Sequence, residues 1–306
     1  MKLARHIVFI LLSVSLGALF LYSAYSKTFP IQIFEYTMVE HLHFSWMLAA
    51  IGARFLIGLE AGIGILLAVN IYGPKKNVLK LGMALMAVFS VYLIYLWAKF
   101  GNNINCGCFG DEVWMSPATS LTKNVIMVIV MALLFRFHNG LRLLLPRFTV
   151  SGILLLIVLL PFILFAIPGS KPDWLSKGGY SINLDPLYAK DISKPPMDVR
   201  HGKYIVAFFS QRCTHCRAAA YKMHLMKLNN PSLPFFMIIG GESALDDFWK
   251  ATQAQDIPYV RMDKTHFLQY TGGIFPLIVW VNNSRVVATS EHTNLNQQVI
   301  EDWVKQ

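Results

Sequence analysis

The sequence predicts an α-helical membrane bundle of about five transmembrane helices followed by a small α/β domain. Composition is the first reason, because hydrophobic residues make up 55% of the 306 residues and charged residues only 14%. A mean hydropathy of +0.47 is too high for an ordinary globular protein. Disorder is excluded because it requires low hydrophobicity and high charge, and four cysteines are too few for a disulfide-dense secreted scaffold.

Five apolar runs are long enough, or nearly long enough, to cross a hydrocarbon core of about 30 Å. They lie at 6–26, 46–70, 78–98, 120–137 and 149–168. Lys2 and Arg5 give the first run the basic start of a signal peptide. The run is longer than the apolar part of such a peptide, however, and residues 22–27 offer no clean cleavage site. We therefore expect it to remain as a transmembrane span.

The Lys and Arg residues of the short loops predict how these spans are oriented. With the N-terminus inside, eight basic residues fall in the inner segments and three in the outer loops. The inner ones are Lys2, Arg5, Lys75, Lys76, Lys80, Arg136, Arg142 and Arg147, and the outer ones are Lys27, Lys99 and Lys123. The expected location is the bacterial inner (cytoplasmic) membrane, with a cytoplasmic N-terminus and a periplasmic C-terminal domain after an odd number of spans.

The formal net charge of +10 lies mainly in the apolar part of the chain. Residues 1–169 hold 12 Lys and Arg against 5 Asp and Glu, whereas the rest of the chain holds 15 against 12. A protein that binds nucleic acid concentrates its basic residues on a polar domain instead. The expected partners therefore include membrane lipid and exclude nucleic acid.

Composition changes sharply after Pro168. Together with the apolar runs, this change divides the chain into four segments. Residues 1–137 hold four spans, 138–168 a loop and the fifth span, 169–196 a linker rich in Pro, Gly, Ser, Asp and Lys, and 197–306 an α/β domain. The strands of that domain are expected at 203–210, 235–239, 259–262, 277–281 and 285–289, and its helices at 213–228, 245–255, 265–270 and 296–305. Strands and helices in alternation indicate a small α/β fold.

The first candidate site is the sequence Cys213-Thr214-His215-Cys216, which follows a strongly apolar strand. Cys213 would open the next helix, where free amide groups and the helix dipole favour a thiolate, so it is the expected nucleophile. Cys216 would lie on the same helical face and resolve a mixed disulfide at Cys213, and His215 would stabilise the thiolate. The alternatives are an inert disulfide or half of a metal site, which the strand–CxxC–helix context disfavours.

Residues 208–216 resemble a thioredoxin-fold active site, and the histidine before the second cysteine is similar to that of the DsbA oxidases. The resemblance covers about residues 186–306. It implies a cis-proline that faces the disulfide, and Pro276 after Phe275 is the matching position; the alternative is an ordinary trans turn proline. Ala207 departs from the family pattern, because the relatives keep a buried acid there that helps proton transfer.

The second candidate site is Cys106-Gly107-Cys108, in the second outer loop and so on the same expected side of the membrane as Cys213. A disulfide between residues two apart requires a tight bend, and Gly107 can adopt the necessary backbone angles. Such a bond would exchange readily. The alternatives are two free thiols or a structural clip on the loop.

The sequence Cys-Gly-Cys-Phe-Gly at 106–110 resembles a signature of the MauE/DoxX family of four-span membrane proteins. Lys27 and Glu60 also suit that family, and the resemblance covers about residues 1–137. It implies redox-associated maturation of exported proteins, because MauE accompanies the thioredoxin-like MauD during disulfide formation in methylamine dehydrogenase.

Arg54 and Glu60 are charges within the second span, and charges inside a membrane are functional candidates. Six residues place them about 120° apart on a helix, so they cannot pair with each other and each is expected to pair with another element. Glu60 is a candidate for proton or quinone handling, with a structural interhelical bond as the equal alternative. Arg54, nearer the outer end of the span, is expected to be a snorkelling or structural residue.

Two cysteine pairs on one side of a membrane suggest an electron relay that forms disulfides in exported proteins. Client thiols, from exported or thioredoxin-like proteins, would reduce Cys213–Cys216, which would pass electrons to Cys106–Cys108 and then to a membrane quinone. The cofactors expected are the redox-active disulfides and the quinone, with no metal. The alternatives are an outward-directed reductase or isomerase using the same residues, and a non-enzymatic thiol metallochaperone or assembly factor.

Overall fold

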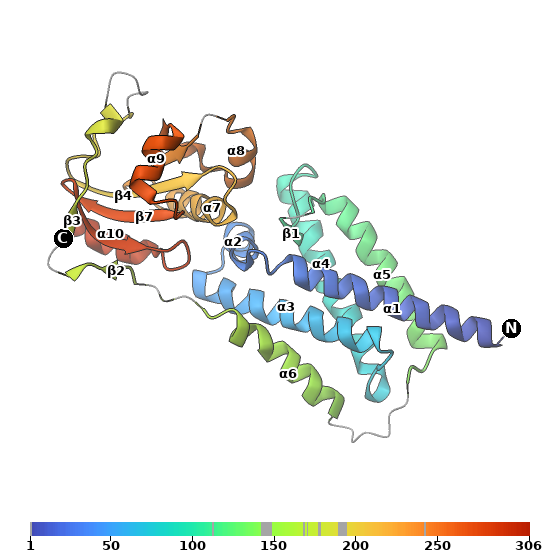
Figure 1. The fold of residues 1–306 in the computed structure, drawn as a ribbon. Helices are drawn as coiled ribbons and strands as arrows, with labels where there is room; N and C mark the ends of the chain where they lie inside the picture. Colours follow the sequence, from blue (N-terminus) through green and yellow to red (C-terminus); the bar gives the residue numbers. More distant parts are fainter. Residues whose placement is uncertain are drawn as a thin grey trace. The chain divides into compact units, whose positions relative to one another are not determined.

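The computed structural model describes residues 2–111, 113–141, 149–167, 169, 171–176, 179–188, 195–241 and 243–306. The chain forms two compact units, Met1–Ile167 and Pro168–Gln306 (Figure 1). The first unit is helical and the second is built on a sheet, as the sequence predicts. Arg142 and Arg147, which contribute to the expected positive inner face, lie outside the described residues.

The helices of the first unit are α1 (Lys2–Ser26), α2 (Ile31–Leu42), α3 (Trp46–Ala68), α4 (Asn77–Phe100), α5 (Pro117–Phe137) and α6 (Thr149–Leu164). Within the described residues, four of them, α1, α3, α4 and α5, are long and apolar enough to cross a membrane. In its most apolar stretch α3 is 61% buried, against 28% for each of the other three. The bundle is therefore arranged around α3, and the remaining spans expose apolar side chains to lipid.

Small residues bring α1 and α6 close to α3. A Cβ atom on Gly17 of α1 would lie 2.6 Å from the backbone nitrogen of Ala68, and one on Gly58 would lie 2.6 Å from the carbonyl oxygen of Val158 in α6. Both separations are shorter than any real contact of a Cβ atom, so only glycine fits. Close backbone approach at small residues is how helices associate in lipid, where the hydrophobic effect between them is absent.

The fifth expected span, 149–168, is shorter in the structure. α6 ends at Leu164, and its 16 residues correspond to about 24 Å, less than the hydrocarbon thickness. The helix stops because its end is fixed: Arg54 donates hydrogen bonds to the carbonyl oxygens of Phe165 at 2.6 Å and Ala166 at 3.2 Å. Leu156, Ile163 and Leu164 of α6 are more than 60% exposed, which suits a surface in contact with lipid.

Helix α2 lies in what the sequence led us to expect as a plain outer loop. It follows the cis peptide bond Phe29–Pro30 and buries Ile31, Tyr36, Met38 and Val39. It packs against α3. Its twelve residues include charged side chains, so it does not have the composition of a span.

The second unit contains a seven-stranded sheet with the strand order β2-β8-β7-β4-β5-β6, and β3 also pairs with β8. The strands are β2 (Asp173–Trp174), β3 (Tyr180–Ser181), β4 (Lys203–Ser210), β5 (Phe235–Gly240), β6 (Tyr259–Met262), β7 (Leu277–Asn282) and β8 (Arg285–Ser290). β4, β5 and β6 are parallel, whereas β7 and β8 are antiparallel to their neighbours. The helices are α7 (Thr214–Asn229), α8 (Asp246–Thr252), α9 (Lys264–Thr271) and α10 (Gln297–Lys305).

This architecture confirms the expected α/β domain and resembles thioredoxin-like folds. β4 is central and almost fully buried from Ile205 to Phe209, as expected for a strand covered on both faces. α7 begins directly beyond the carboxyl end of β4 (Figure 1), with Cys213 as its N-cap and Cys216 in its first turn. The sheet therefore presents these cysteines at one end of its central strand.

The segment expected to be a linker, 169–196, belongs in part to the second unit. Asp173 and Trp174 pair with Thr289 and Ala288, and Tyr180 and Ser181 pair with Val286 and Arg285. Leu184 and Leu187 are 1% and 0% exposed within the core. Two-residue strands are too short to show an alternating pattern, so the composition of the segment suggested a linker although half of it packs on the sheet.

Candidate functional site

The loop that carries Cys106 and Cys108 lies between α4 and α5 and is held against the helices around it. The amide of Cys106 donates to the carbonyl of Met115 at 3.0 Å. Gly110 has φ +62°, and a Cβ atom there would lie 2.4 Å from the carbonyl oxygen of Ser26. The second glycine of the Cys-Gly-Cys-Phe-Gly sequence is therefore required both by its backbone conformation and by the close approach of α1.

Both cysteines of this loop are free thiols, and they differ in environment. The Cys106 sulfur lies 2.9 Å from the Ser120 hydroxyl and accepts a hydrogen bond from the Cys108 amide at 3.4 Å. A hydrogen bond from the Cys108 thiol is the largest cause that lowers the pKa of Cys106 to about 6, assisted by Ser120 and Lys123. The same bond, together with burial, raises the pKa of Cys108. Cys106 is thus the thiolate of the reduced pair.

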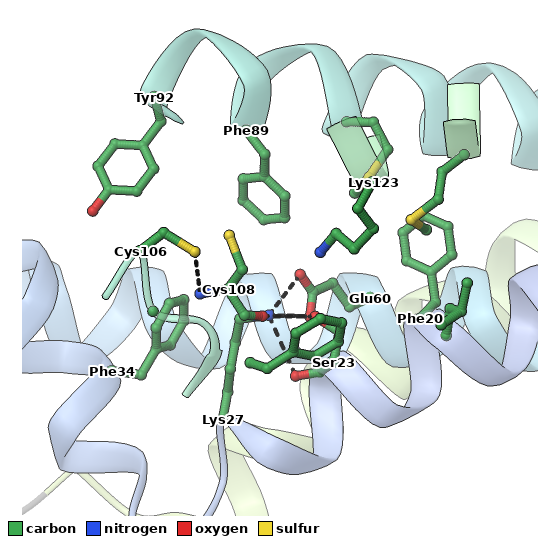
Figure 2. A pocket seen from close by; sticks show the side chains of 15 residues that line it. Phe20, Ser23, Lys27, Phe34, Glu60, Phe89, Tyr92, Cys106, Cys108 and Lys123 are labelled. Carbon is green, nitrogen blue, oxygen red and sulfur yellow. Dashed lines mark hydrogen bonds and ion pairs between the residues drawn. The ribbon is translucent and has the colours of Figure 1, made fainter. Parts of the chain in front are cut away.

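These two cysteines line a cavity of about 50 Å³ among the helices of the bundle (Figure 2). Most of the lining is apolar, and three charged side chains interrupt it: Lys27, Glu60 and Lys123. The other lining residues are Leu19, Phe20, Ser23, Phe34, Met86, Phe89, Tyr92, Gly107, Phe109 and Met127.

Lys27 and Glu60 form a buried ion pair. The Lys27 amine lies 2.8 Å and 3.0 Å from the two carboxylate oxygens of Glu60, and the side chains are 2% and 1% exposed. Lys27 also donates to the Ser23 hydroxyl at 2.6 Å, and that hydroxyl donates to the Cys108 carbonyl at 3.1 Å. A continuous chain of hydrogen bonds therefore connects Glu60 on α3 to the cysteine loop.

Lys123 is the third charge of the pocket and comes from α5. Its ammonium nitrogen lies 4.2 Å from the centroid of the Phe109 ring. Figure 2 shows its amine pointing into the space that the Cys108 sulfur and Glu60 also face. Two ammonium groups and one carboxylate leave one positive charge in this lining, which a thiolate would neutralise.

Arg54 lies outside this pocket and has a structural role, as expected. It pairs with Glu35 of α2 at 2.6 Å and is 1% exposed. Its other donors reach the carbonyls of Ala50, Phe165 and Ala166. Arg54 and Glu60 do not pair with each other, as their spacing on the helix predicts.

The second cysteine pair begins α7, where Cys213 is the N-cap residue. The Cys213 sulfur is partly exposed and accepts a hydrogen bond from the Cys216 amide at 3.2 Å. A hydrogen bond from the Cys216 thiol is the largest cause that lowers the pKa of Cys213 to about 6, with help from the helix amides and Arg217. Burial raises the pKa of Cys216, which is fully buried. This asymmetry is what an attacking and a resolving thiol require.

Pro276 follows a cis peptide bond after Phe275 and directly precedes β7. The Phe275 carbonyl oxygen lies 3.8 Å from the Cys213 sulfur. The structure thus brings the proline loop to Cys213, as the sequence predicts. Ala207, in the middle of β4, is fully buried and supplies no titratable group there.

His215 is exposed on the first turn of α7, and its ring lies 4.6 Å from the ring of His292, measured between centroids. The structure therefore gathers Cys213, His215, Cys216 and Pro276 in one unit, and Cys106, Cys108 and Glu60 in the other.

Sequence reasoning missed several residues of these sites. Lys123 was counted as an outer-loop residue, although a charge near the start of an apolar run is a recognised signal for function. Ser23 and Ser120 gave no signal, because hydroxyl groups are common in transmembrane helices. His292 follows the last strand by two residues, and its position beside His215 depends on the fold.

Known proteins are similar to parts of this chain. Residues 5–137 match the family described as methylamine utilisation protein MauE. Protein TlpB of Flavobacterium psychrophilum is 26% identical over 291 residues, with 79% of each chain covered.

Two solved structures are similar to the C-terminal part of the chain. The first is the thioredoxin domain of a thiol-disulfide oxidoreductase from Bacteroides vulgatus, at 17% identity and a TM-score of 0.31, covering 42% of this chain and 99% of that domain. The second is a secreted disulfide oxidoreductase of Mycobacterium tuberculosis, described as homologous to DsbE of E. coli, at 14% identity and a TM-score of 0.27, covering 34% and 81%. Residues 5–137 of this protein thus match the MauE family of membrane proteins, and an α/β domain with a CxxC pair follows them in the same chain.

Proposed function

We propose that the protein is a membrane-bound thiol-disulfide oxidoreductase that supports disulfide formation in exported proteins. In this proposal electrons pass from client thiols to Cys213–Cys216, then to Cys106–Cys108, and finally to a quinone in the membrane. The observation that carries it is that each unit holds one cysteine pair of the same geometry, in which the first sulfur accepts a hydrogen bond from the amide of the second cysteine, at 3.4 Å in Cys106–Cys108 and 3.2 Å in Cys213–Cys216.

The first step is thiol-disulfide exchange at α7. A client thiolate attacks the Cys213 sulfur of the Cys213–Cys216 disulfide, and the Cys216 sulfur leaves and takes up a proton. A second client thiolate then attacks the client sulfur of the mixed disulfide and releases Cys213 as a thiolate. The client is oxidised by two electrons, and the Cys213–Cys216 pair is reduced by two.

The second step transfers the two electrons to the loop of the membrane domain. The Cys213 thiolate attacks one sulfur of the Cys106–Cys108 disulfide, and Cys216 then resolves the mixed disulfide. The product is a Cys106–Cys108 dithiol, whose Cys106 thiolate is favoured by Ser120 and by the positive charge of Lys123. Both pairs must face the same side of the membrane for this step, and the periplasmic side is our proposal, from the distribution of Lys and Arg.

A quinone would complete the cycle by accepting two electrons and two protons from this dithiol. The cavity beside the cysteines, about 50 Å³, is too small for a quinone ring, since ligand pockets usually exceed about 300 Å³. A shallow apolar groove of about 520 Å³ shares Leu19, Lys123 and Met127 with that cavity. The groove lies between α1 and α5, and a quinone ring in it would lie beside Lys123.

Anaerobic quinone reduction by the reduced, purified full-length protein tests this proposal. The wild type holds two dithiols and should form two quinols per chain. Cys213→Ser should form one, because the loop pair alone remains competent, and Cys106→Ser should form none. Quinol formation that is equal in Cys106→Ser and the wild type would exclude the loop pair as the donor to quinone. No quinol in any of the three would exclude quinone as the acceptor and favour electron flow outward, to client disulfides.

A further inference from the structure

His292 packs against His215 of the CxxC segment, and the proposed exchange gives it no role. It lies in the turn between β8 and α10, two residues after Ser290. Its ring and that of His215 are 4.6 Å apart between centroids and inclined by 37°. The two imidazoles come from different elements, so the fold and not the local sequence brings them together.

The turn that carries His292 is fixed by α7. Lys222, only 7% exposed, donates to the carbonyl oxygens of His292 at 3.4 Å and Thr293 at 3.1 Å. Within the turn, the Glu291 amide donates to the Asn294 side chain at 2.9 Å. These contacts hold the backbone at His292 in place relative to the helix that starts at Cys213.

Burial keeps the His292 ring neutral near pH 7. It is the largest cause that lowers the pKa of His292 to about 4, and the charges of His215 and Lys222 act in the same direction. Both of these groups belong to α7, and Glu291 is the acidic residue of its own turn. A neutral imidazole offers one nitrogen as a hydrogen-bond donor and the other as an acceptor, so it can pair with a second ring beside it.

We propose that His292 is a positioning residue for His215: it holds the His215 ring against the first turn of α7, at whose start Cys213 lies. The inference rests on the proposed function only in taking Cys213 as the exchanging thiol. An imidazole held on that turn stabilises the Cys213 thiolate, whereas one that rotates freely spends most of its time away from it.

Alkylation of reduced full-length protein by iodoacetamide, followed across pH by mass spectrometry of the Cys213 peptide, tests the inference. Replacing His292 by Phe keeps a ring but removes the nitrogen atoms that can hydrogen-bond to His215, so the alkylation midpoint of Cys213 should rise. A rise of half a pH unit corresponds to about threefold less thiolate well below the midpoint. His224→Gln, farther along α7 and paired with Asp256, is the matched control and should leave the midpoint in place.

A double-mutant cycle separates positioning from a general structural effect. In a His215→Gln background, His292→Phe should cause no further shift of the midpoint. An equal shift in both backgrounds would overturn the inference, as would an unchanged midpoint in a His292→Phe protein with wild-type circular dichroism. The measurement needs no quinone, so failure of the relay leaves it intact. A Cys213 without a reactive thiolate in the wild type would instead contradict the proposed function.

Discussion

The hydroxyl oxygen of Ser23 lies 3.1 Å from the carbonyl oxygen of Cys108 and 2.6 Å from the amine of Lys27. One side chain of α1 thus links the cysteine loop to the buried Lys27–Glu60 pair. The position of the loop and the charge balance inside the bundle therefore depend on each other. A substitution in the Lys27–Glu60 pair should change the position of the cysteine loop.

Removing one partner of the Lys27–Glu60 pair should be more damaging than removing both. Lys27→Met or Glu60→Gln alone leaves an uncompensated buried charge, which costs about 3–5 kcal/mol. The double variant leaves none, so its melting temperature in detergent should lie above that of either single variant. Losses that simply add in the double variant would contradict the pairing.

Lys123 should contribute to the reactivity of Cys106, because its positive charge is one of the causes that lower the pKa of that thiol to about 6. Lys123→Gln should therefore decrease alkylation of reduced Cys106 at pH 7, and a pKa rise of one unit would about halve the thiolate at that pH. Lys123→Arg should retain most of the rate. Lys99→Gln, at the end of α4 where Lys99 donates to Tyr95, is the control for loss of a nearby surface charge. Equal rates for Lys123→Gln and Lys99→Gln would exclude the pocket charge as the cause.

The potential of the Cys213–Cys216 pair should change slope with pH near pH 6. Since the pKa of reduced Cys213 is lowered to about 6, reduction takes up two protons below that pH and one above it. The slope should therefore change from about −59 to about −30 mV per pH unit as pH rises. The stabilisation of the reduced form by the thiolate is lost as pH falls through 6.

Redox titration of a full-length Cys106→Ser/Cys108→Ser variant in glutathione buffers measures this slope, because only the CxxC pair remains. A slope of about −59 mV throughout pH 5–8 would contradict the lowered pKa of Cys213.

Direct transfer between the pairs should be detectable as a trapped adduct. A Cys216→Ser/Cys108→Ser variant keeps the two thiols of lowered pKa, Cys213 and Cys106. Under mild oxidation it should form an intramolecular Cys213–Cys106 disulfide, which peptide mapping identifies. The matched variant, Cys216→Ser/Cys106→Ser, should form its adduct more slowly because the remaining Cys108 has a raised pKa. Absence of both adducts would count against direct exchange.

Much of this architecture could be predicted from the sequence. The long apolar runs predicted α1, α3, α4 and α5. Short apolar strands that alternate with helices predicted the central sheet. Both patterns extend over many residues. α2, β2 and β3 could not be predicted with the same means. α2 is short and charged, and two-residue strands owe their existence to the edge of β8 that they pair with.

The candidate sites divide in the same way. Spacing in the sequence marks the four cysteines, Cys106, Cys108, Cys213 and Cys216. Two cysteines two or three residues apart are typical of a redox-active pair. The partners that set their chemistry come from distant parts of the chain. Lys123 and His292 acquire their roles only when α5 folds beside α1, and the turn after β8 beside α7.

The hydrogen bonds from Arg54 to the carbonyls of Phe165 and Ala166 fix the last residues of the helical unit. The chain leads directly from these residues into the α/β domain. Because β2 begins at Asp173, only residues 167–172 separate that fixed point from the sheet. The seven Cα–Cα steps from Ala166 to Asp173 extend to about 25 Å at most. The covalent connection therefore limits how far the first strand can move from that point. A tether this short makes the encounter of Cys213 with any thiol on its own bundle an intramolecular event, independent of how dilute the protein is in the membrane.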